Sequence, residues 1–243
     1  MGGQTFVPLL MTPAMSSRQT FDKLTDKLKR AYAAALLQIA HNLEKEQQDE
    51  LRFYFTGLIT RGETGAFNIL RSLENAGEIS WEDVSYLKEA LRVVQRLDLA
   101  KTLTSFEVKR DLTILLDFYA NRRQGSELFC PPAFEKVEKM AGYLAIVMTE
   151  MARDRFDVGN AVSLLVEPRK GIRKVLVDFE EEIKRELSDP WSKLTSLVVI
   201  AGEIVAAALA NEEFRREPEV LKLCSTAAEE LYSRMIKLGS WVS

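Results

Sequence analysis

The chain has 243 residues, of which 47% are hydrophobic and 28% charged, and its formal net charge is −3. This is the composition of a soluble globular protein, long enough for one large or two small domains. A pI of about 5.5 argues against nucleic-acid binding, which usually requires a basic surface. One histidine and two cysteines, Cys130 and Cys224, leave little for a metal site, a disulfide framework or a histidine-based catalytic triad.

The leader and the helices that follow it can be predicted from breakers and periodicity. Pro8 and Pro13 interrupt the short apolar run at the start, so we expect residues 1–17 to be a flexible leader rather than a signal peptide. After the leader, apolar residues recur every three or four positions, which is the spacing of helices that bury one face. The predicted helices of the first half cover 20–40, 51–59, 67–73, 84–94 and 97–106.

Local features refine this series of helices. Gly77 is placed to end the third helix, and Ser80 is placed to begin the fourth as its N-cap. The three rings of Phe53, Tyr54 and Phe55 cannot all face the core from one helix. We therefore expect at least one of these rings to point outward, and Phe53 is either a core residue or part of an exposed hydrophobic patch.

The segment Arg96-Leu97-Asp98-Leu99 matches the Arg-x-Asp-Leu signature of death effector domains. Its context agrees, because Leu51 to Phe55 resembles the core of that family's second helix, and Phe67 to Ile79 resembles a helix and short loop of the family. The resemblance covers roughly 20–110. It implies a six-helix death fold that binds the death effector domains of adaptors and initiator caspases.

The same resemblance implies an interaction surface. Its expected residues are Phe53, Arg96, Asp98 and Leu99. In the family, an acidic residue of the second helix completes a charge cluster with the signature. The matching position here is Gln47, and Glu46 and Glu50 lie beside it as alternatives. The other interpretation of Arg96 and Asp98 is a solvated helix cap, whose surface pairs contribute about 0–1 kcal/mol.

Chain breakers divide the sequence near residues 121–133. Gly125, Pro131 and Pro132 interrupt the helical periodicity at this point. We therefore expect a death-effector-type domain at 18–124, a linker at 125–132 and a second helical bundle at 133–243. Each domain is expected to fold independently.

The second half contains a strong helix start followed by the most apolar run of the chain. Asp189 is a favourable N-cap, and Pro190 is favourable in the first turn. The run that follows, 191–210, is long enough to span a bilayer, but Lys193 and Glu203 interrupt it. A buried central helix is therefore favoured over a membrane span.

The run from Trp191 to Gly202 resembles the first homology motif of the Bcl family of apoptosis regulators. Trp191 and Lys193 stand at the motif's Trp and Arg positions, and Gly202 belongs to its pair of small residues. This resemblance covers roughly 133–243 and implies a bundle around a central apolar helix, with a groove for amphipathic death-motif helices. The expected groove residues are Trp191, Lys193, Leu194, Leu197, Gly202 and Trp241.

The sequence shows no phosphate-binding loop, metalloprotease motif or Cys-x-x-Cys motif, so we expect no enzyme, cofactor or metal. The expected function is regulation of apoptosis by protein contacts, linking death-effector-domain proteins to Bcl-family partners. The expected location is the cytoplasm, with recruitment by partners to mitochondria or receptor complexes, and self-association is left open. The alternative is a non-enzymatic helical scaffold, whose second bundle only braces the death effector domain and has no groove.

Overall fold

The computed structural model describes residues 17–59, 65–125, 130–151, 168–186, 189–210 and 217–237. Within these ranges it contains nine α-helices, one short 3-10 helix and no strands, which confirms the predicted all-α class. The α-helices are α1 (Ser17–Asn42), α2 (Lys45–Tyr54), α3 (Ala66–Asn75), α4 (Ser85–Val93), α5 (Leu97–Arg123), α6 (Glu135–Met151), α8 (Pro168–Glu186), α9 (Pro190–Ala210) and α10 (Glu217–Lys237). The predicted leader lies almost wholly outside the described residues, as do positions 126–129 of the predicted linker.

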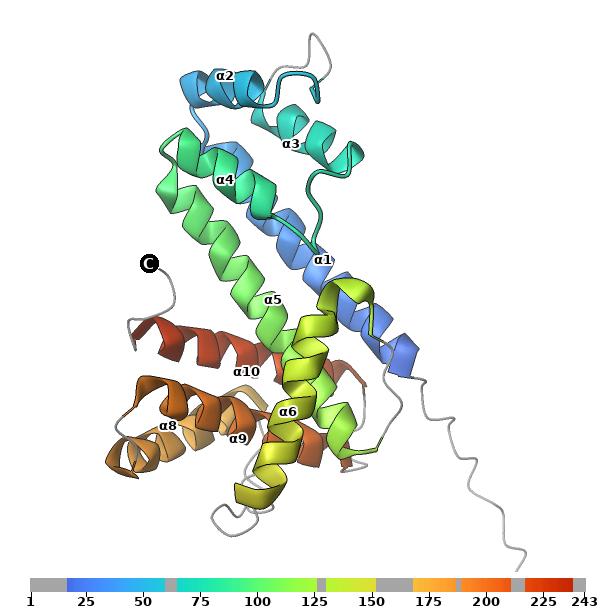
Figure 1. Ribbon diagram of the computed structural model, residues 1–243, viewed down its shortest axis with the longest axis vertical. Helices are drawn as coiled ribbons and strands as arrows, with labels where there is room; N and C mark the ends of the chain where they lie inside the picture. Colours follow the sequence, from blue (N-terminus) through green and yellow to red (C-terminus); the bar gives the residue numbers. More distant parts are fainter. Residues whose placement is uncertain are drawn as a thin grey trace, which may run out of the picture.

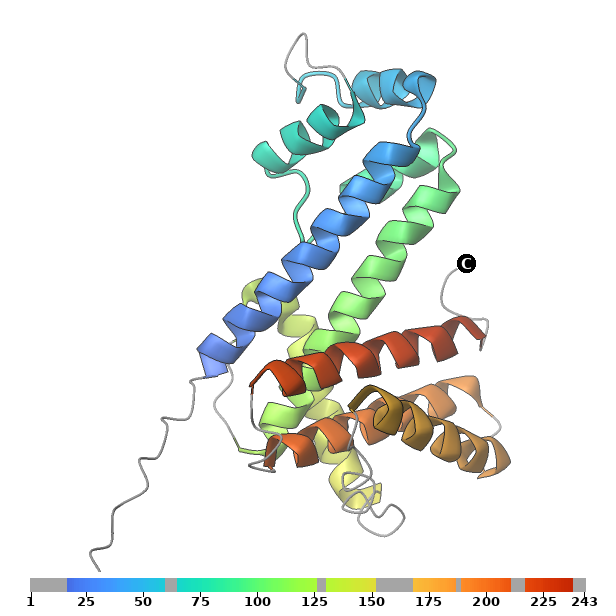
Figure 2. The ribbon, with the colours of Figure 1, turned by 180° about the vertical axis from the view of Figure 1, so that it is seen from behind.

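Two long helices, α1 and α5, run side by side, and the other helices are arranged around their two ends. At one end of this pair lie α2, α3 and α4, and at the other end lie α6, α8, α9 and α10 (Figures 1 and 2). We call these two ends the upper and lower parts. Each part has its own cluster of buried apolar side chains, and both clusters draw residues from α1 and α5.

The upper cluster extends from Tyr32 on α1 to Phe106 on α5. Gly77 ends α3 with a φ of +75°, as predicted. The helix predicted over 51–59 lies earlier in the chain, because α2 runs from Lys45 to Tyr54, and Gly57, beyond its end, adopts a φ of +97°. The described residues therefore provide five helices to this part rather than six, with turns after α2.

The helix predicted after Ser80 starts later than expected. The Ser80 hydroxyl accepts the backbone N–H groups of Glu82 and Asp83, as an N-cap would. However, these bonds close a turn, and the Asp83 carboxylate then accepts the N–H of Ser85, where α4 begins. The predicted hydrogen bonds of Ser80 are therefore present, but they close a turn instead of capping α4.

The lower cluster is built around α9, which packs against α5, α6, α8 and α10. Its start is the predicted one, because the Asp189 carboxylate accepts the N–H of Ser192 at 2.7 Å. By length and composition, the segment Ser192–Ala210 is also apolar enough to cross a membrane, but 61% of it is buried inside the protein. A core helix passes the same test, so the packing favours the predicted buried central helix.

The two clusters meet inside α1 and α5, earlier in the chain than the linker predicted at 125–132. Arg110 of α5 lies at this junction, where it donates hydrogen bonds to the backbone carbonyls of Trp81 and Glu82 at 3.0 and 2.7 Å. The Trp81 ring packs against Phe134, with ring centroids 5.3 Å apart, and the Arg110 guanidinium lies over Phe134. The segments before α4 and α6 are thereby joined to the middle of α5.

Candidate functional site

Arg96 connects three helices at the top of the upper part. Its guanidinium forms two parallel hydrogen bonds with the Asp98 carboxylate, from Nε at 2.9 Å and from Nη2 at 2.7 Å. Its Nη1 donates to Gln47 Oε1 at 2.6 Å and to the backbone carbonyl of Asn42. The Arg96 side chain, only 16% exposed, therefore joins the end of α1, the first turn of α2 and the start of α5.

The pairing fixes the charges at this corner. The hydrogen bonds from Arg96 lower the pKa of Asp98 to about 2, and the hydrogen bond with Asp98 raises the pKa of Arg96. Both side chains are therefore charged at neutral pH. Asp98 is well exposed, so it presents a carboxylate of fixed orientation at the surface.

Gln47, rather than Glu46 or Glu50, accepts the hydrogen bond from Arg96. The position that the family register selected is therefore the one that completes the cluster, but with a neutral amide. The same Gln47 oxygen accepts the backbone N–H of Glu44 at 3.1 Å, closing the capping box of α2. The amide keeps the cluster's geometry and removes one negative charge from it.

Phe53 is the most exposed large apolar side chain in the described structure, with 84% of its surface free. Phe55 is fully buried and packs its ring against Tyr86, with centroids 5.2 Å apart, and Tyr54 is half-buried. The expectation that one of the three rings points outward is therefore met by Phe53. On the exposed side of α2, Phe53 shares the surface with acidic residues, which we call the α2 face: Glu46, Asp49, Glu50 and Phe53.

Leu99 does not belong to the surface. It is 3% exposed and lies in the upper cluster, whereas Leu97 is 58% exposed. The two leucines are about 200° apart around a helix, so only one of them can face the core. Leu97 and Val93, which is equally exposed, are surface apolar side chains that the signature motif did not indicate. The periodicity of α5 was the signal that could have found Leu97.

Three of the six residues predicted to line a groove lie in the lower core. Leu194 and Leu197 are buried in the lower cluster. Gly202 is buried against the Tyr119 ring so closely that an added Cβ would lie 2.6 Å from a ring carbon. Lys193 is partly exposed, Trp191 lies in the first turn of α9, and Trp241 is outside the described residues.

A polar network that the sequence did not indicate joins the end of α5 to α9. The Glu203 carboxylate accepts hydrogen bonds from the Tyr119 hydroxyl at 2.5 Å and from Arg123 Nε at 2.6 Å. The Gln124 side-chain amide donates to the backbone carbonyl of Ala206 at 2.9 Å. Glu203, which interrupts the apolar run in sequence, is therefore a packing contact with α5. Among the described residues, no cluster of His, Cys, Asp and Glu is placed to hold a metal ion.

These features define a helical module that has a rigid charged corner and an exposed aromatic ring. Residues 32–109 match the family model of the death effector domain. This range begins at Tyr32 and ends just after Phe106, the first and last residues of the upper cluster. The upper part of the molecule is therefore a death effector domain, a non-catalytic domain for protein–protein interaction in apoptotic signalling.

The helices that follow the death effector domain are left unassigned by the family comparison, which therefore does not support the Bcl-family resemblance of the second half. No curated protein and no solved structure matches the chain at a significant level.

Proposed function

We propose that this protein regulates apoptotic signalling by binding the death effector domain of an adaptor or an initiator caspase. The α2 face is one contact surface in this proposal, and the observation that supports it best is the exposure of Phe53. A large, solvent-exposed aromatic ring beside three carboxylates is typical of an interface anchor with a polar rim.

The complementary surface is the corner between α4 and α5. It combines two exposed apolar side chains with exposed basic ones, and we call it the α4–α5 corner: Arg92, Val93, Leu97 and Lys101. The exposed carboxylate of Asp98, which is paired with Arg96, borders this corner, and Arg92 and Lys101 supply the positive charge that matches the acidic α2 face. We therefore propose that homotypic binding pairs the α2 face of one death effector domain with the α4–α5 corner of another.

The C-terminal bundle, in our proposal, supports α5. The lower core includes Leu194 and Leu197, and Gly202 packs against Tyr119. This packing favours the scaffold alternative over a ligand groove. Binding to Bcl-family partners remains a prediction without an observation in its favour.

The binding proposal is tested with Phe53→Glu and a matched control, Phe67→Glu. Phe67 is also an exposed phenylalanine of the death effector domain, but it lies on α3. We expect Phe53→Glu to weaken binding to a purified initiator-caspase death effector domain by at least about tenfold, because replacing an aromatic hot-spot residue typically causes a loss of this size. Fluorescence polarisation measures the affinity. The control should bind like the wild type. Equal binding by both variants would reject the α2 face.

The scaffold role is tested with amphipathic death-motif peptides and the full chain. We expect no peptide to bind with a Kd below about 100 μM, a free energy of about −5.5 kcal/mol. Tight binding that Lys193→Glu weakens would instead support the groove.

A further inference from the structure

Arg110 is a buried cation of α5 whose hydrogen bonds lead to the segment before α4. Its side chain is 7% exposed. Its Nε donates to the carboxylate of the neighbouring Asp111 at 2.8 Å, and its Nη1 donates to the backbone carbonyls of Trp81 and Glu82. A guanidinium removed from water needs hydrogen-bond acceptors, and carbonyls outside a helix need donors. This one contact satisfies both requirements.

The segment that receives these bonds has no helix of its own. Residues 76–84 connect α3 to α4 through turns and irregular backbone. Ile79 and Val84 are buried in the upper cluster and anchor the segment on both sides of the two bonded carbonyls. Arg110 ties the stretch between these anchors to α5. Loss of Arg110 should therefore leave the upper core packed but free the backbone that leads into α4.

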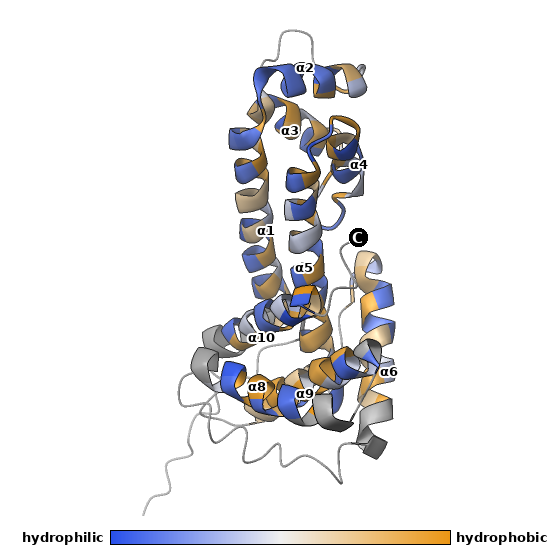
Figure 3. Cartoon of the chain, turned by 90° about the vertical axis from the view of Figure 1, so that its left-hand side faces the viewer, coloured by the Kyte–Doolittle hydropathy of each residue, from blue (hydrophilic) through white to orange (hydrophobic). Residues whose placement is uncertain are grey.

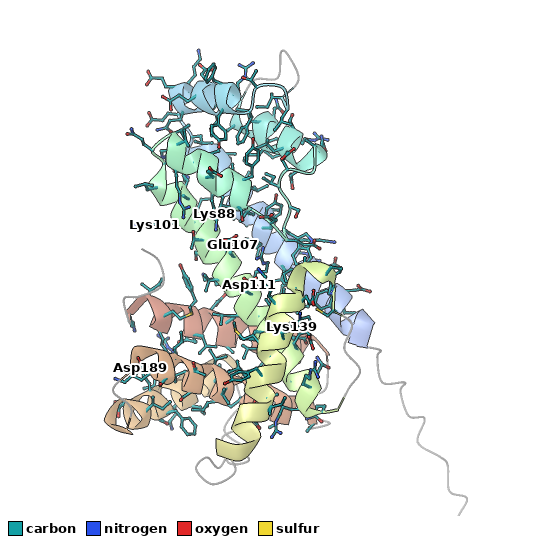
Figure 4. The ribbon with its side chains drawn as sticks, in the orientation of Figure 1. Lys88, Lys101, Glu107, Asp111, Lys139 and Asp189 are labelled. Carbon is teal, nitrogen blue, oxygen red and sulfur yellow. The ribbon has the colours of Figure 1, made fainter. Side chains whose placement is uncertain are left out.

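Further charged contacts hold α4 between this segment and the α4–α5 corner. The Asp83 carboxylate accepts the N–H of the first residue of α4, and its pKa is lowered mainly by that hydrogen bond and also by the charge of Arg110. Further along α4, Lys88 forms an ion pair with Glu107 of α5, and both side chains are largely buried. Figure 4 shows this pair beside Lys101 of the α4–α5 corner. The contacts of Arg110 are thus continuous with those that place the corner.

Phe134 of the lower part covers Arg110. This fully buried residue directly precedes α6. Its ring centroid lies 5.6 Å from Cζ of Arg110, 5.3 Å from the Trp81 ring and 6.5 Å from the Phe21 ring of α1. In Figure 3, α4 and α6 lie on the same side of α5, one in the upper part and one in the lower part. A side chain of the lower part therefore packs on the segment that leads into α4.

These contacts extend beyond the residues that match the death effector domain. The match ends at residue 109, one position before Arg110, and Phe134 lies well outside it. We propose that Arg110 and Phe134 are positioning residues, which fix the start of α4 and thereby make binding through the α4–α5 corner depend on the lower part. The α2 face lies at the far end of the upper part (Figure 1), so it should not depend on them. The inference rests on the proposed function for the role of the corner in binding.

The first test follows α4 directly by hydrogen–deuterium exchange of the full chain. It compares the wild type with Arg110→Gln, Phe134→Leu and a control, Leu176→Ala. Leu176 is fully buried in the lower cluster on α8, which packs against α9 and α10. We expect both junction variants to raise exchange over residues 80–93 by about tenfold, because local opening depends on the contacts of the segment that opens. The control should exchange there like the wild type. Unchanged exchange in the junction variants, or an equal increase in the control, would overturn the proposal.

The second test separates the two contact surfaces by binding to a purified initiator-caspase death effector domain. A Phe53→Glu background leaves the α4–α5 corner for binding, and a Leu97→Glu background leaves the α2 face. We expect Arg110→Gln and Phe134→Leu to weaken binding about fivefold in the first background and less than about twofold in the second. General destabilisation would affect both backgrounds alike. Equal weakening in the two backgrounds, or no binding in the first, would overturn the dependence of the corner on the lower part.

The two measurements also separate this inference from the proposed function. A wild-type chain that does not bind the caspase domain would reject the proposed function, while the exchange over residues 80–93 would still decide whether Arg110 and Phe134 hold α4. Binding by the wild type together with unchanged exchange in both variants would instead reject this inference and leave the proposed function in place.

Discussion

Asp117 is a carboxyl group in the middle of the lower core. It is 4% exposed, and burial raises its pKa to about 7. The titratable groups around it are the buried thiol of Cys224 on α10, whose pKa is raised by burial, and Lys27 on α1, whose pKa is lowered by burial and which acts on Cys224. Asp117 is therefore close to half-protonated at neutral pH.

The raised pKa of Asp117 makes stability depend on pH. Between about pH 4 and 7 the folded chain binds a proton at Asp117 that the unfolded chain releases, so this contribution to stability decreases as pH rises through that window. We expect Asp117→Asn to remove this dependence and to stabilise the protein above pH 7 by about 2–4 kcal/mol. Urea unfolding of both proteins from pH 4 to 8 measures this difference. Parallel pH profiles would contradict the assignment.

Arg96 is a second residue whose substitution should change stability. If Arg96 and Asp98 were only an exposed ion pair, which contributes about 0–1 kcal/mol, replacing both by alanine would leave the melting temperature nearly unchanged. The structure changes this expectation, because Arg96 also donates to Asn42 and Gln47. We expect Arg96→Ala to cost about 1–3 kcal/mol and Asp98→Ala, at the exposed partner, less than about 1 kcal/mol. Equal costs in denaturant unfolding would show that Arg96 acts only through the pair.

At the scale of elements, the upper helices were predictable and the length of α5 was not. Periodicity located α1, α3 and α4 but only the last turn of α2, and the register of a family motif selected Gln47 and Arg96, which the structure brings together. From Leu112 to Ala120, however, every side chain of α5 is buried, including the polar Thr113 and Asp117. A helix surrounded by other helices has no polar stripe, so the sequence lacks the signal that would extend it.

Contacts between elements explain why the sequence alone could not distinguish groove residues from packing residues. A small residue such as Gly202 is compatible with a ligand groove or with close helix packing, and only the position of Tyr119 distinguishes these roles. Lys193 and Trp191 were predicted from a motif whose surroundings depend on tertiary contacts. The residues near Trp191 and Lys193 in the chain do not specify those contacts.

The packing of α9 on α5 yields a prediction for Gly202. Alanine is normally favoured over glycine in a helix by about 1 kcal/mol. Here the added Cβ would meet three carbons of the Tyr119 ring within 2.9 Å, so the ring or α9 must shift. We expect Gly202→Ala to destabilise the protein by about 1–3 kcal/mol, and Ala206→Gly on the same helix serves as a control for backbone effects. A stabilised Gly202→Ala protein in thermal unfolding would contradict the contact.

At the scale of the whole molecule, the two cores share α1 and α5. The sequence predicted that residues 18–124 fold independently. Truncation after 124 would expose the lower half of α5, which is apolar on nearly all sides: Leu112, Ile114, Leu115, Leu116, Phe118 and Tyr119. We expect fragment 18–124 to aggregate or to melt without a cooperative transition, and the full chain to unfold in a single transition in calorimetry. A soluble fragment that melts cooperatively would instead support the prediction that residues 18–124 fold independently.

The continuity of α5 also limits how the length of this chain can vary. One residue inserted between Phe106 and Leu112 would rotate everything beyond it by about 100° and advance it by about 1.5 Å. The buried faces of both halves would then be out of phase, and α1, which runs alongside without an insertion, could match only one of them. Turns such as the one at residues 55–59, after α2, tolerate added residues at little cost. The α5 helix, in contrast, fixes the rotation of one end of the molecule relative to the other end.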